Sequence, residues 1–286
     1  MRELPFPSEP RERAHRALAH THTHPQVGDH QTSIMLKLYG VPLSQPFRSV
    51  AWALLHKREP FEFVMKVPGM KGKVGTRSDD FMAKAPLATV PVIEEPDGTV
   101  VWESSAILSY LSDSRGWSDL LPPEPKARAK INSFLHWHHH GTRSLSNTVT
   151  PYFRPDLGAV DDEGLAKRRA AAAATLETFS SVYLAREGAD FVAGSPTVSI
   201  ADFLAYPEVA QMLPGYCNAM GPSHSLPAPV AAWCERMQSL PHHDVVHVCL
   251  AELGDVTAPS DVTMVKRMAA ATKAGVHALT AATKDI

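Results

Sequence analysis

The segment Leu36–Arg48 constrains the fold more than any other stretch, because it combines a strand, a turn and the start of a helix. A short apolar run ends at Gly40, and the glycine and prolines that follow are typical of a turn. Beyond the turn, apolar residues recur with the spacing of one helix face. These residues are Phe47, Val50, Ala51, Leu54 and Leu55. The pattern predicts a buried strand that turns into an amphipathic helix.

Ser44 lies where this turn meets the helix, and a serine there has two interpretations. It can cap the helix by accepting a backbone N–H, and Pro46 fits the first helical turn, where a missing N–H costs nothing. Its hydroxyl can also help to bind an anion, such as a thiolate, at the positive end of the helix. The segment alone favours the capping role, and the two roles are compatible.

The length of 286 residues is enough for two domains. The formal net charge of −2 gives no indication of a nucleic-acid partner or an anionic membrane surface. We find no apolar run long enough to cross a membrane. The cysteines are Cys217, Cys234 and Cys249, without CxxC spacing, which fits a reducing, cytoplasmic location. The N-terminal half therefore has no thiol nucleophile.

Residues 1–33 are expected to be a disordered leader, because Pro, Arg, Glu and His alternate there without an apolar period. The arginines hint at a transit peptide, but the glutamates argue against one, since such peptides are poor in acidic residues. His20, His22 and His24 alternate with threonine. Without a folded frame and further ligands we do not expect them to form a specific metal site.

Residues 34–116 are expected to form an α/β module. A second strand is predicted at 61–66, and the helix between it and the first strand favours a parallel pair. Residues 68–80 are rich in Gly and Lys, and we expect a loop without regular structure. The expected order is strand, helix, strand, loop, strand, strand, helix, which gives a mixed sheet with helices packed on it.

Asp97-Gly98 separates two β-rich runs, at 90–94 and 99–102, and this is a strong hairpin signal. Pro91 opens the first of these runs, so it either starts a strand or follows a cis peptide bond. A helix is predicted from about Ser104.

Residues 117–125 contain a proline-rich linker, and beyond it we find only helical patterns. The predicted all-helical domain spans 126–254. Its expected helices cover 126–147 with a kink near Gly141, 161–186, a helix opened by a Ser199–Asp202 capping box, 229–239 and 244–253. The tail, 255–286, is expected to be only weakly helical, around 265–274.

His136 and His140 are four residues apart on the first of these helices, which is a spacing seen in metal sites. No glutamate lies between them and no third ligand is evident, whereas a zinc site needs at least three protein ligands. A structural or solvated role is favoured, and no metal site is expected.

Several short motifs resemble those of the cytosolic glutathione transferases. Leu43–Arg48 is similar to the Ser-Gln-Pro-x-Arg motif of the theta-class, serine-type branch, and Thr89–Pro91 to the stretch that holds the family's cis-proline. Glu103–Leu108 resembles the Glu-Ser-x-Ala-Ile motif, and Trp137–Arg143 the theta segment that carries an active-site arginine. The resemblance covers about residues 35–253. It implies a thioredoxin-like α/β domain followed by an all-α domain.

The resemblance implies a role for each matched residue in binding glutathione. Ser44 would donate a hydrogen bond to the glutathione sulfur and favour the thiolate, the nucleophilic form. The Val90 backbone would pair with the cysteinyl backbone of glutathione, as an added strand does, and Pro91 would shape the site. Glu103 and Ser104 would bind the ammonium and the α-carboxylate of the γ-glutamyl end.

The resemblance also implies charged contacts at the two ends of the site. Gln45, with Lys71 or Lys73, would reach the glycyl carboxylate of glutathione. Arg143 would supply positive charge on the electrophile side, near the thiolate or an anionic leaving group.

The function implied by the resemblance is conjugation of glutathione, as co-substrate, to small electrophiles that include halides, by a homodimer. The alternative is a non-catalytic module of the same fold that binds a ligand or mediates assembly. A thiol-disulfide oxidoreductase is disfavoured, because position 44 is serine and the first module has no cysteine.

Overall fold

The computed structural model describes residues 35–154, 160–184, 190–256 and 262–286. All of its helices and strands belong to one compact unit, residues 33–286. The predicted leader, with its histidines and the question of a transit peptide, lies outside the described residues.

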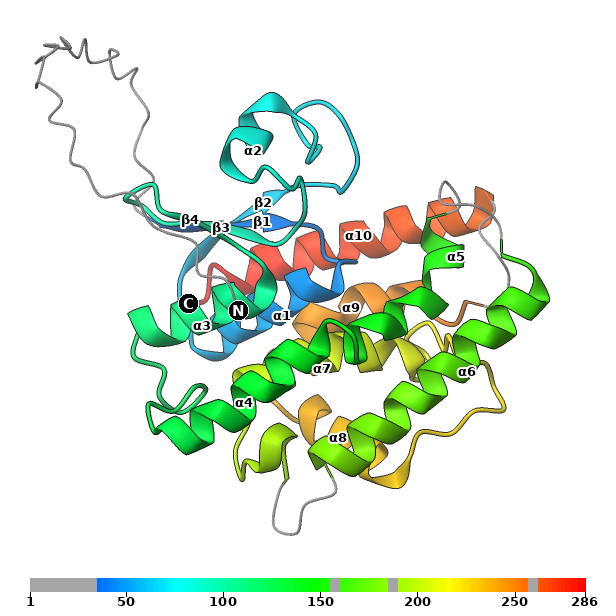
Figure 1. Cartoon of the computed structure of the whole chain (residues 1–286). Coiled ribbons are helices and arrows are strands. Elements are labelled where there is room, and N and C mark those ends of the chain that lie inside the picture. Colours follow the sequence, from blue (N-terminus) through cyan, green and yellow to red (C-terminus); the bar gives the residue numbers. More distant parts are fainter. Residues whose placement is uncertain (1–34, 155–159, 185–189, 257–261) are drawn as a thin grey trace, which may run out of the picture. The chain divides into compact units, whose positions relative to one another are not determined.

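Within the described residues the N-terminal module contains one mixed sheet of order β2-β1-β3-β4 (Figure 1). Its strands are β1 (Leu36–Gly40), β2 (Phe61–Met65), β3 (Val92–Glu94) and β4 (Val100–Trp102). β1 pairs in parallel with β2 and antiparallel with β3, and β3 and β4 form the hairpin around Asp97-Gly98. The predicted parallel pair and the predicted hairpin are both confirmed.

The two faces of this sheet are covered by different helices (Figure 1). Alternate strand residues point to opposite faces. Leu38 and Ile93 belong to the main core with α1 (Gln45–His56) and α3 (Ser104–Ser114). Tyr39 and Val92 instead form a small cluster with Phe81 of α2 (Asp79–Lys84).

Helix α2 was not predicted. We expected no regular structure up to residue 80 and a strand as the next element. It has six residues and begins after Ser78. Phe81 is its one buried residue, so the sequence contains no repeating apolar pattern that could reveal it.

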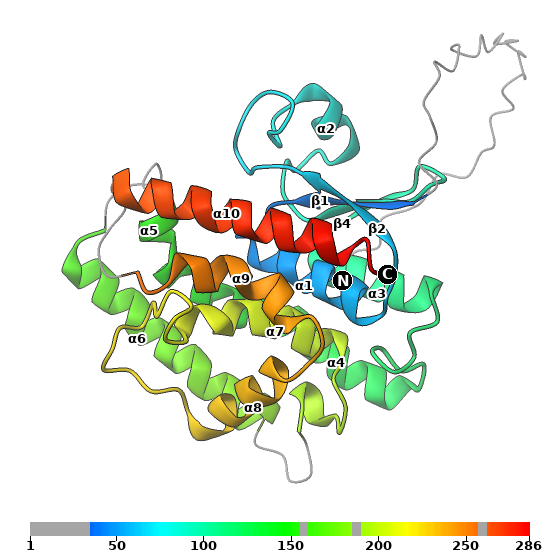
Figure 2. The ribbon, with the colours of Figure 1, turned by 180° about the vertical axis from the view of Figure 1, so that it is seen from behind.

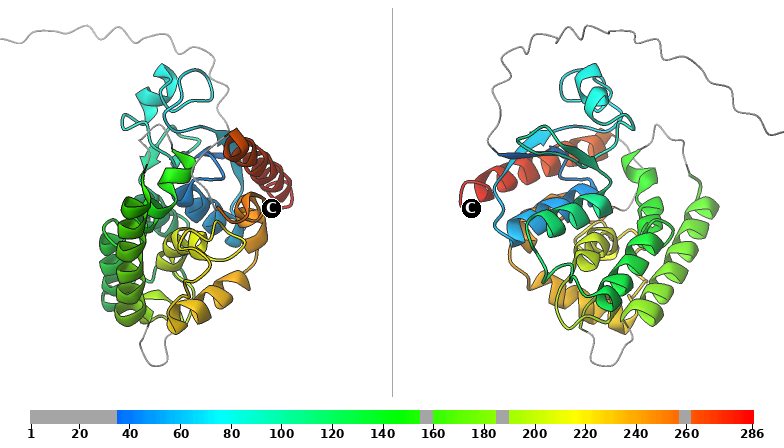
Figure 3. Two further views of the ribbon diagram at one scale, coloured as in Figure 1. Left: turned by 90° about the vertical axis from the view of Figure 1, so that its right-hand side faces the viewer. Right: turned by 60° about the vertical axis from the view of Figure 1, so that its left-hand side comes forward.

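The remaining regular elements of the described chain are helical, as predicted. Its segments are α4 (Pro125–His138), η1 (Thr142–Thr148), α5 (Thr150–Phe153), α6 (Asp162–Thr178), η3 (Phe179–Leu184), η4 (Val192–Gly194), α7 (Ile200–Val209), η5 (Ala210–Met212), α8 (Ala228–Gln238), α9 (His243–Leu253) and α10 (Val262–Ala282). Both views of Figure 3 show α7 at the centre, with α4 and α6 on one side and α9 and α10 on the other.

The long helix expected at 126–147 is broken rather than kinked. α4 ends at His138, and a 3₁₀ segment, η1, begins after Gly141. A Cβ atom at Gly141 would lie 2.4 Å from the Trp137 ring, so only glycine allows the chain to pass so close to the indole. His140 therefore lies beyond the helix end and does not share a helix face with His136.

Helix α7 is buried along its whole length, and the predicted capping box at its start is confirmed. The Asp202 carboxylate accepts hydrogen bonds from the Ser199 and Val192 N–H groups and from the Trp233 indole. Burial raises the pKa of this carboxyl, while these hydrogen bonds oppose that effect. The polar contacts fix the α7 start against η4 and α8.

The N-terminal module and the helices share one continuous hydrophobic core. Trp52 of α1 packs edge-on against Phe203 and Tyr206 of α7 and against His247 of α9. Its indole N–H donates to the Pro241 carbonyl at 2.8 Å. The link between the two modules is therefore a packed interface.

The tail forms a regular 21-residue helix, α10, where only weak helix was expected. Figure 2 shows it lying along α9. Its buried residues include Ala271 and Gly275, whose small size lets the two helices approach closely. Such residues give a weak amphipathic pattern in sequence, which explains the underestimate.

Candidate active site

A cleft of about 960 Å³ opens between the N-terminal module and the helices. One side is formed by the Val41–Ser44 turn and the segment before β3. The opposite side is formed by η1, α5 and α10. The lining residues on these sides include Ser44, Gln45, Val90, Arg143, Phe153, Met268, Lys273 and Val276. The predicted residues Ser44, Gln45, Val90 and Arg143 are thus brought together.

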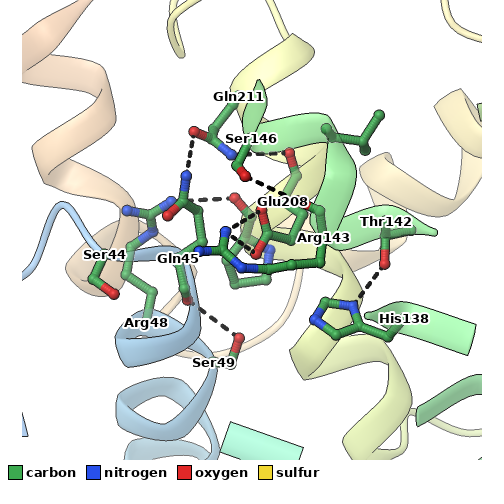
Figure 4. A network of polar contacts seen from close by, with 12 residues as sticks. Ser44, Gln45, Arg48, Ser49, His138, Thr142, Arg143, Ser146, Glu208 and Gln211 are labelled. Carbon is green, nitrogen blue, oxygen red and sulfur yellow. Dashed lines mark hydrogen bonds and ion pairs between the residues drawn. The ribbon is translucent and has the colours of Figure 1, made fainter. Parts of the chain in front are cut away.

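Ser44 is the N-cap of α1, half-buried at the edge of the cleft. Its N–H donates to the Val41 carbonyl at 2.9 Å and closes the turn. Its hydroxyl oxygen accepts from the Phe47 N–H at 3.5 Å, the outer limit of a hydrogen bond. The described residues provide no acceptor for the hydroxyl proton, and Figure 4 shows the side chain apart from the polar network. This hydroxyl can donate to a bound ligand.

The Val90–Pro91 peptide bond is cis and directly precedes β3. The backbone N–H and C=O of Val90 form no hydrogen bond with any described residue. Val90 lines the cleft, so an unpaired donor and acceptor lie at its edge. An extended peptide can pair with such groups as an added strand.

Glu103 separates β4 from α3 and is the N-cap of α3, and Ser104 is the first residue of that helix. Neither residue lines the cleft. Val92 pairs with Trp102, so continuing this register would place Ser104 opposite Val90. Glu103 has a φ of 68°, which costs energy for a residue other than glycine. The first N–H groups of α3 follow at once, and a helix N-terminus attracts carboxylates.

Arg143, in η1, faces the cleft on the side opposite the turn. Its Nη1 donates to both carboxylate oxygens of Glu208 in α7, at 3.0 and 3.3 Å. The Arg143 side chain is 40% exposed, whereas that of Glu208 is 1% exposed. Burial raises the pKa of Glu208 to about 7, and the Arg143 and Arg48 guanidinium groups limit that rise. The buried Glu208 carboxylate thus holds Arg143 in place, while the guanidinium still reaches the cleft.

Gln45 is connected to this pair by amide hydrogen bonds (Figure 4). Its Nε2 donates to the Gln211 Oε1 at 2.6 Å, and the Gln211 Nε2 donates to the Glu208 carbonyl at 3.2 Å. One N–H of Gln45 is therefore committed within the protein. The predicted contact with a glycyl carboxylate would need its second N–H.

Lys71 and Lys73 are exposed, and neither lines this cleft. Lys73 instead lines a separate hollow of about 850 Å³ beside Tyr39. Its carbonyl accepts from the Lys66 Nζ at 2.7 Å, which fixes the loop in this position. The structure does not group these lysines with Ser44, because the loop folds toward the α2 side of the sheet.

Comparison with known proteins identifies the family. The family model for the glutathione S-transferase N-terminal domain matches residues 38–118. Glutathione S-transferase theta-2 of Rattus norvegicus is 31% identical over 209 residues, which is 71% of this chain and 81% of the rat protein. The chain belongs to the glutathione S-transferase family.

Solved structures of other glutathione transferases have the same fold. Human glutathione S-transferase T1-1, in its apo form, superposes with a TM-score of 0.64 at 26% identity, over 84% of this chain and 99% of the human one. Human glutathione transferase theta-2, in complex with glutathione, gives a TM-score of 0.65 at 24% identity, over 83% and 98% of the two chains.

The tail of this transferase supplies one wall of the cleft, which the sequence analysis missed. Val265, Met268, Thr272 and Val276 of α10 line it, together with Lys273. The charged residues among the described lining residues, Arg143, Arg154 and Lys273, are all basic. Side chains that recur every three or four residues along 264–276 were the available sequence signal for this wall. Such spacing predicts a helix but does not indicate which element the helix packs against.

Within the part of the chain that the structure describes, the histidines of the transferase do not gather into a metal cluster. His138 is buried, and its Nδ1 lies 2.7 Å from the Thr142 hydroxyl. Burial, aided by the Arg143 charge, lowers the pKa of His138 to about 3, so this ring is neutral. Among the described residues no group of three or more His, Cys, Asp or Glu could hold a metal ion. None of the described helices combines the length and hydropathy needed to cross a bilayer.

Proposed function

We propose that this glutathione transferase uses the Ser44 hydroxyl to hold bound glutathione as a thiolate, which then attacks a small electrophile. One observation carries the proposal. The Ser44 hydroxyl, at the N-terminus of α1, has no acceptor for its proton among the described residues, and the Val90 backbone has no partner among them; both groups border one cleft. A sulfur atom and an extended peptide backbone fit these two features together.

The Ser44 hydroxyl donates a hydrogen bond to the sulfur, and the nearby helix N-terminus favours negative charge there. A free thiol has a pKa of about 8.5, so both effects increase the thiolate fraction at neutral pH. The thiol proton passes to water. The sulfur lone pair then forms a C–S bond while the leaving group departs with the electrons of its bond to the same carbon.

Glutathione is held along the edge that leads from the turn to α3. The Val90 N–H and C=O pair with the cysteinyl backbone. The Ser104 hydroxyl and the α3 N-terminus bind the γ-glutamyl carboxylate, and Glu103 binds the adjacent ammonium. The second N–H of Gln45 is the remaining candidate for the glycyl end.

Arg143 acts on the electrophile side of the cleft. Its guanidinium is held by Glu208 and partly exposed, so it stabilises negative charge that develops on a leaving group. Wild-type protein should therefore conjugate simple aryl and alkyl halides.

The test compares wild type with Ser44→Ala. The variant should bind a glutathione resin but turn over about 100-fold more slowly, because it lacks the donor to the sulfur. Ser114→Ala is the matched control, since Ser114 is exposed at the end of α3. Equal rates for wild type and Ser44→Ala would refute the serine mechanism. A folded wild type without turnover on a broad electrophile panel would favour the non-catalytic module.

We also propose that the chain is a homodimer, as its resemblance to the family implies. Light scattering on the purified protein should give twice the mass of the 31.2 kDa chain. A monomer at micromolar concentration would refute this.

A further inference from the structure

A buried arginine lies beneath the turn that carries Ser44. Arg48, on α1, is completely buried. Its Nη1 donates to the Pro42 and Leu43 carbonyls at 3.0 and 2.9 Å. Its Nη2 donates to the Pro207 carbonyl in α7 at 3.2 Å. One guanidinium therefore joins two consecutive peptide groups of the turn to the central helix of the other module.

Arg48 forms no ion pair with a carboxylate among the described residues. A buried charge is costly unless hydrogen bonds compensate for it, and an apolar side chain would fill the same volume at lower cost. An apolar side chain cannot hold three carbonyl groups in a fixed geometry, whereas the planar guanidinium does. The bonds to the turn are thus the specific contribution of this residue.

Helices α9 and α10 also contact the same turn. The Cys249 thiol in α9 donates to the Pro42 carbonyl at 3.3 Å. A Cβ atom on Gly275 of α10 would lie 2.5 Å from the Pro42 Cβ, closer than atoms can approach. Glycine inside a helix is destabilising relative to alanine, so this position keeps a residue that weakens the helix and permits close contact.

We propose that Arg48 is a positioning residue for the reaction and that α10, through Gly275, completes its effect. Arg48 fixes the planes of the two peptide groups that precede Ser44, and Gly275 lets α10 confine Pro42. Together they set where the Ser44 hydroxyl lies relative to the bound sulfur. The inference rests on the proposed function of Ser44.

The experiment measures the thiol pKa of bound glutathione from the ultraviolet absorption of its thiolate, together with kcat and KM. The variants are Arg48→Lys, which keeps the charge but loses the planar fork, and Gly275→Ala, which adds one methyl group. We expect each to raise the bound thiol pKa by about one unit, a tenfold loss of thiolate below that pKa. At such a pH kcat should fall about tenfold, while KM for glutathione changes less than about threefold.

Two control variants make similar substitutions at positions away from the turn. Arg128→Lys changes an arginine of α4 that pairs with Asp113 near the surface, and Ala270→Ser adds one atom on the exposed side of α10. Both should behave as wild type. If Arg48→Lys does not fold, Gly275→Ala decides the question alone.

Amide hydrogen exchange of the ligand-free protein provides a second readout. The Ser44 N–H is bonded to the Val41 carbonyl, and its exchange should accelerate in both variants. A lowered thiol pKa in wild type that is lost in Ser44→Ala but retained in Arg48→Lys and Gly275→Ala would overturn this inference alone. A loss of folding stability in those variants without a change in the bound thiol pKa would also overturn this inference alone. If wild type does not lower the thiol pKa of bound glutathione, the serine mechanism fails. In that case, unchanged amide exchange of the Ser44 N–H in the two variants would overturn the positioning role as well.

Discussion

At the scale of single residues, Ser44 caps α1 at the edge of the cleft, and buried polar contacts of Arg48, Glu208 and Gln211 lie nearby. The position of Ser44 before an amphipathic run predicts a helix cap, and the structure has that cap. Its relation to Arg48, Glu208 and Gln211 depends on contacts between residues far apart in the chain. Polar pairs of this kind have no local pattern, so the network under the cleft was not predicted.

Glu208 gives a prediction about pH. Its pKa of about 7 in the folded chain exceeds its ordinary value of 4.5, so the folded state binds this proton more tightly than the unfolded state. The contribution of Glu208 to the free energy of unfolding therefore decreases as pH rises from about 4.5 to 7. Glu208→Gln cannot ionise and should gain stability relative to wild type across this range, by up to about 3 kcal/mol.

Urea unfolding at pH 5 and pH 8 checks this. Glu163→Gln is the control, since Glu163 is exposed on α6 and should show no such trend. A stability difference between Glu208→Gln and wild type that is the same at both pH values would contradict the prediction.

At the scale of elements, local sequence patterns predicted most of the helix and strand boundaries. They missed the boundaries that depend on contacts between side chains. The β3–β4 hairpin follows from Asp97-Gly98 and the start of α7 from Ser199 and Asp202, because turns and caps are chosen by adjacent residues. The break after α4 depends on the Trp137 ring meeting Gly141, and the path of the Lys73 loop depends on a bond from Lys66. Neither contact leaves a repeating signal in sequence.

The start of α7 gives a prediction about stability. Asp202→Ala should destabilise the fold by about 3 kcal/mol or more, because it leaves buried N–H donors of Ser199, Val192 and Trp233 without an acceptor. Asp161→Ala removes an exposed cap on α6 and should cost about 1 kcal/mol. Thermal unfolding of both variants measures the contrast, and similar losses would show that burial is not the cause.

At the scale of the whole molecule, the sequence predicted an α/β module followed by helices, and this fold is confirmed. The proline-rich stretch predicted a linker between the modules, whereas the modules are packed through a shared core around Trp52. The tail was not predicted to be part of the site, although α10 forms a wall of the cleft. Which surfaces meet is decided by packing in three dimensions, and hydrophobic periodicity does not encode the partner.

The shared core predicts one cooperative unfolding transition. Tryptophan fluorescence and far-ultraviolet circular dichroism should give the same urea midpoint, because neither module can unfold without exposing the surface around Trp52. Trp52→Leu should shift both midpoints together. Two separated transitions in wild type would mean that the modules are independently stable.

The contact of Gly275 with Pro42 joins the last helix of the chain to its first turn. During synthesis the N-terminal segments leave the ribosome first. The turn that carries the hydroxyl is thus made early but gains its final support only when translation is nearly finished. A chain cut short by a premature stop codon before α10 would lack that support. If Ser44 acts as proposed, we expect such truncated products to activate a bound thiol less well than the full-length chain.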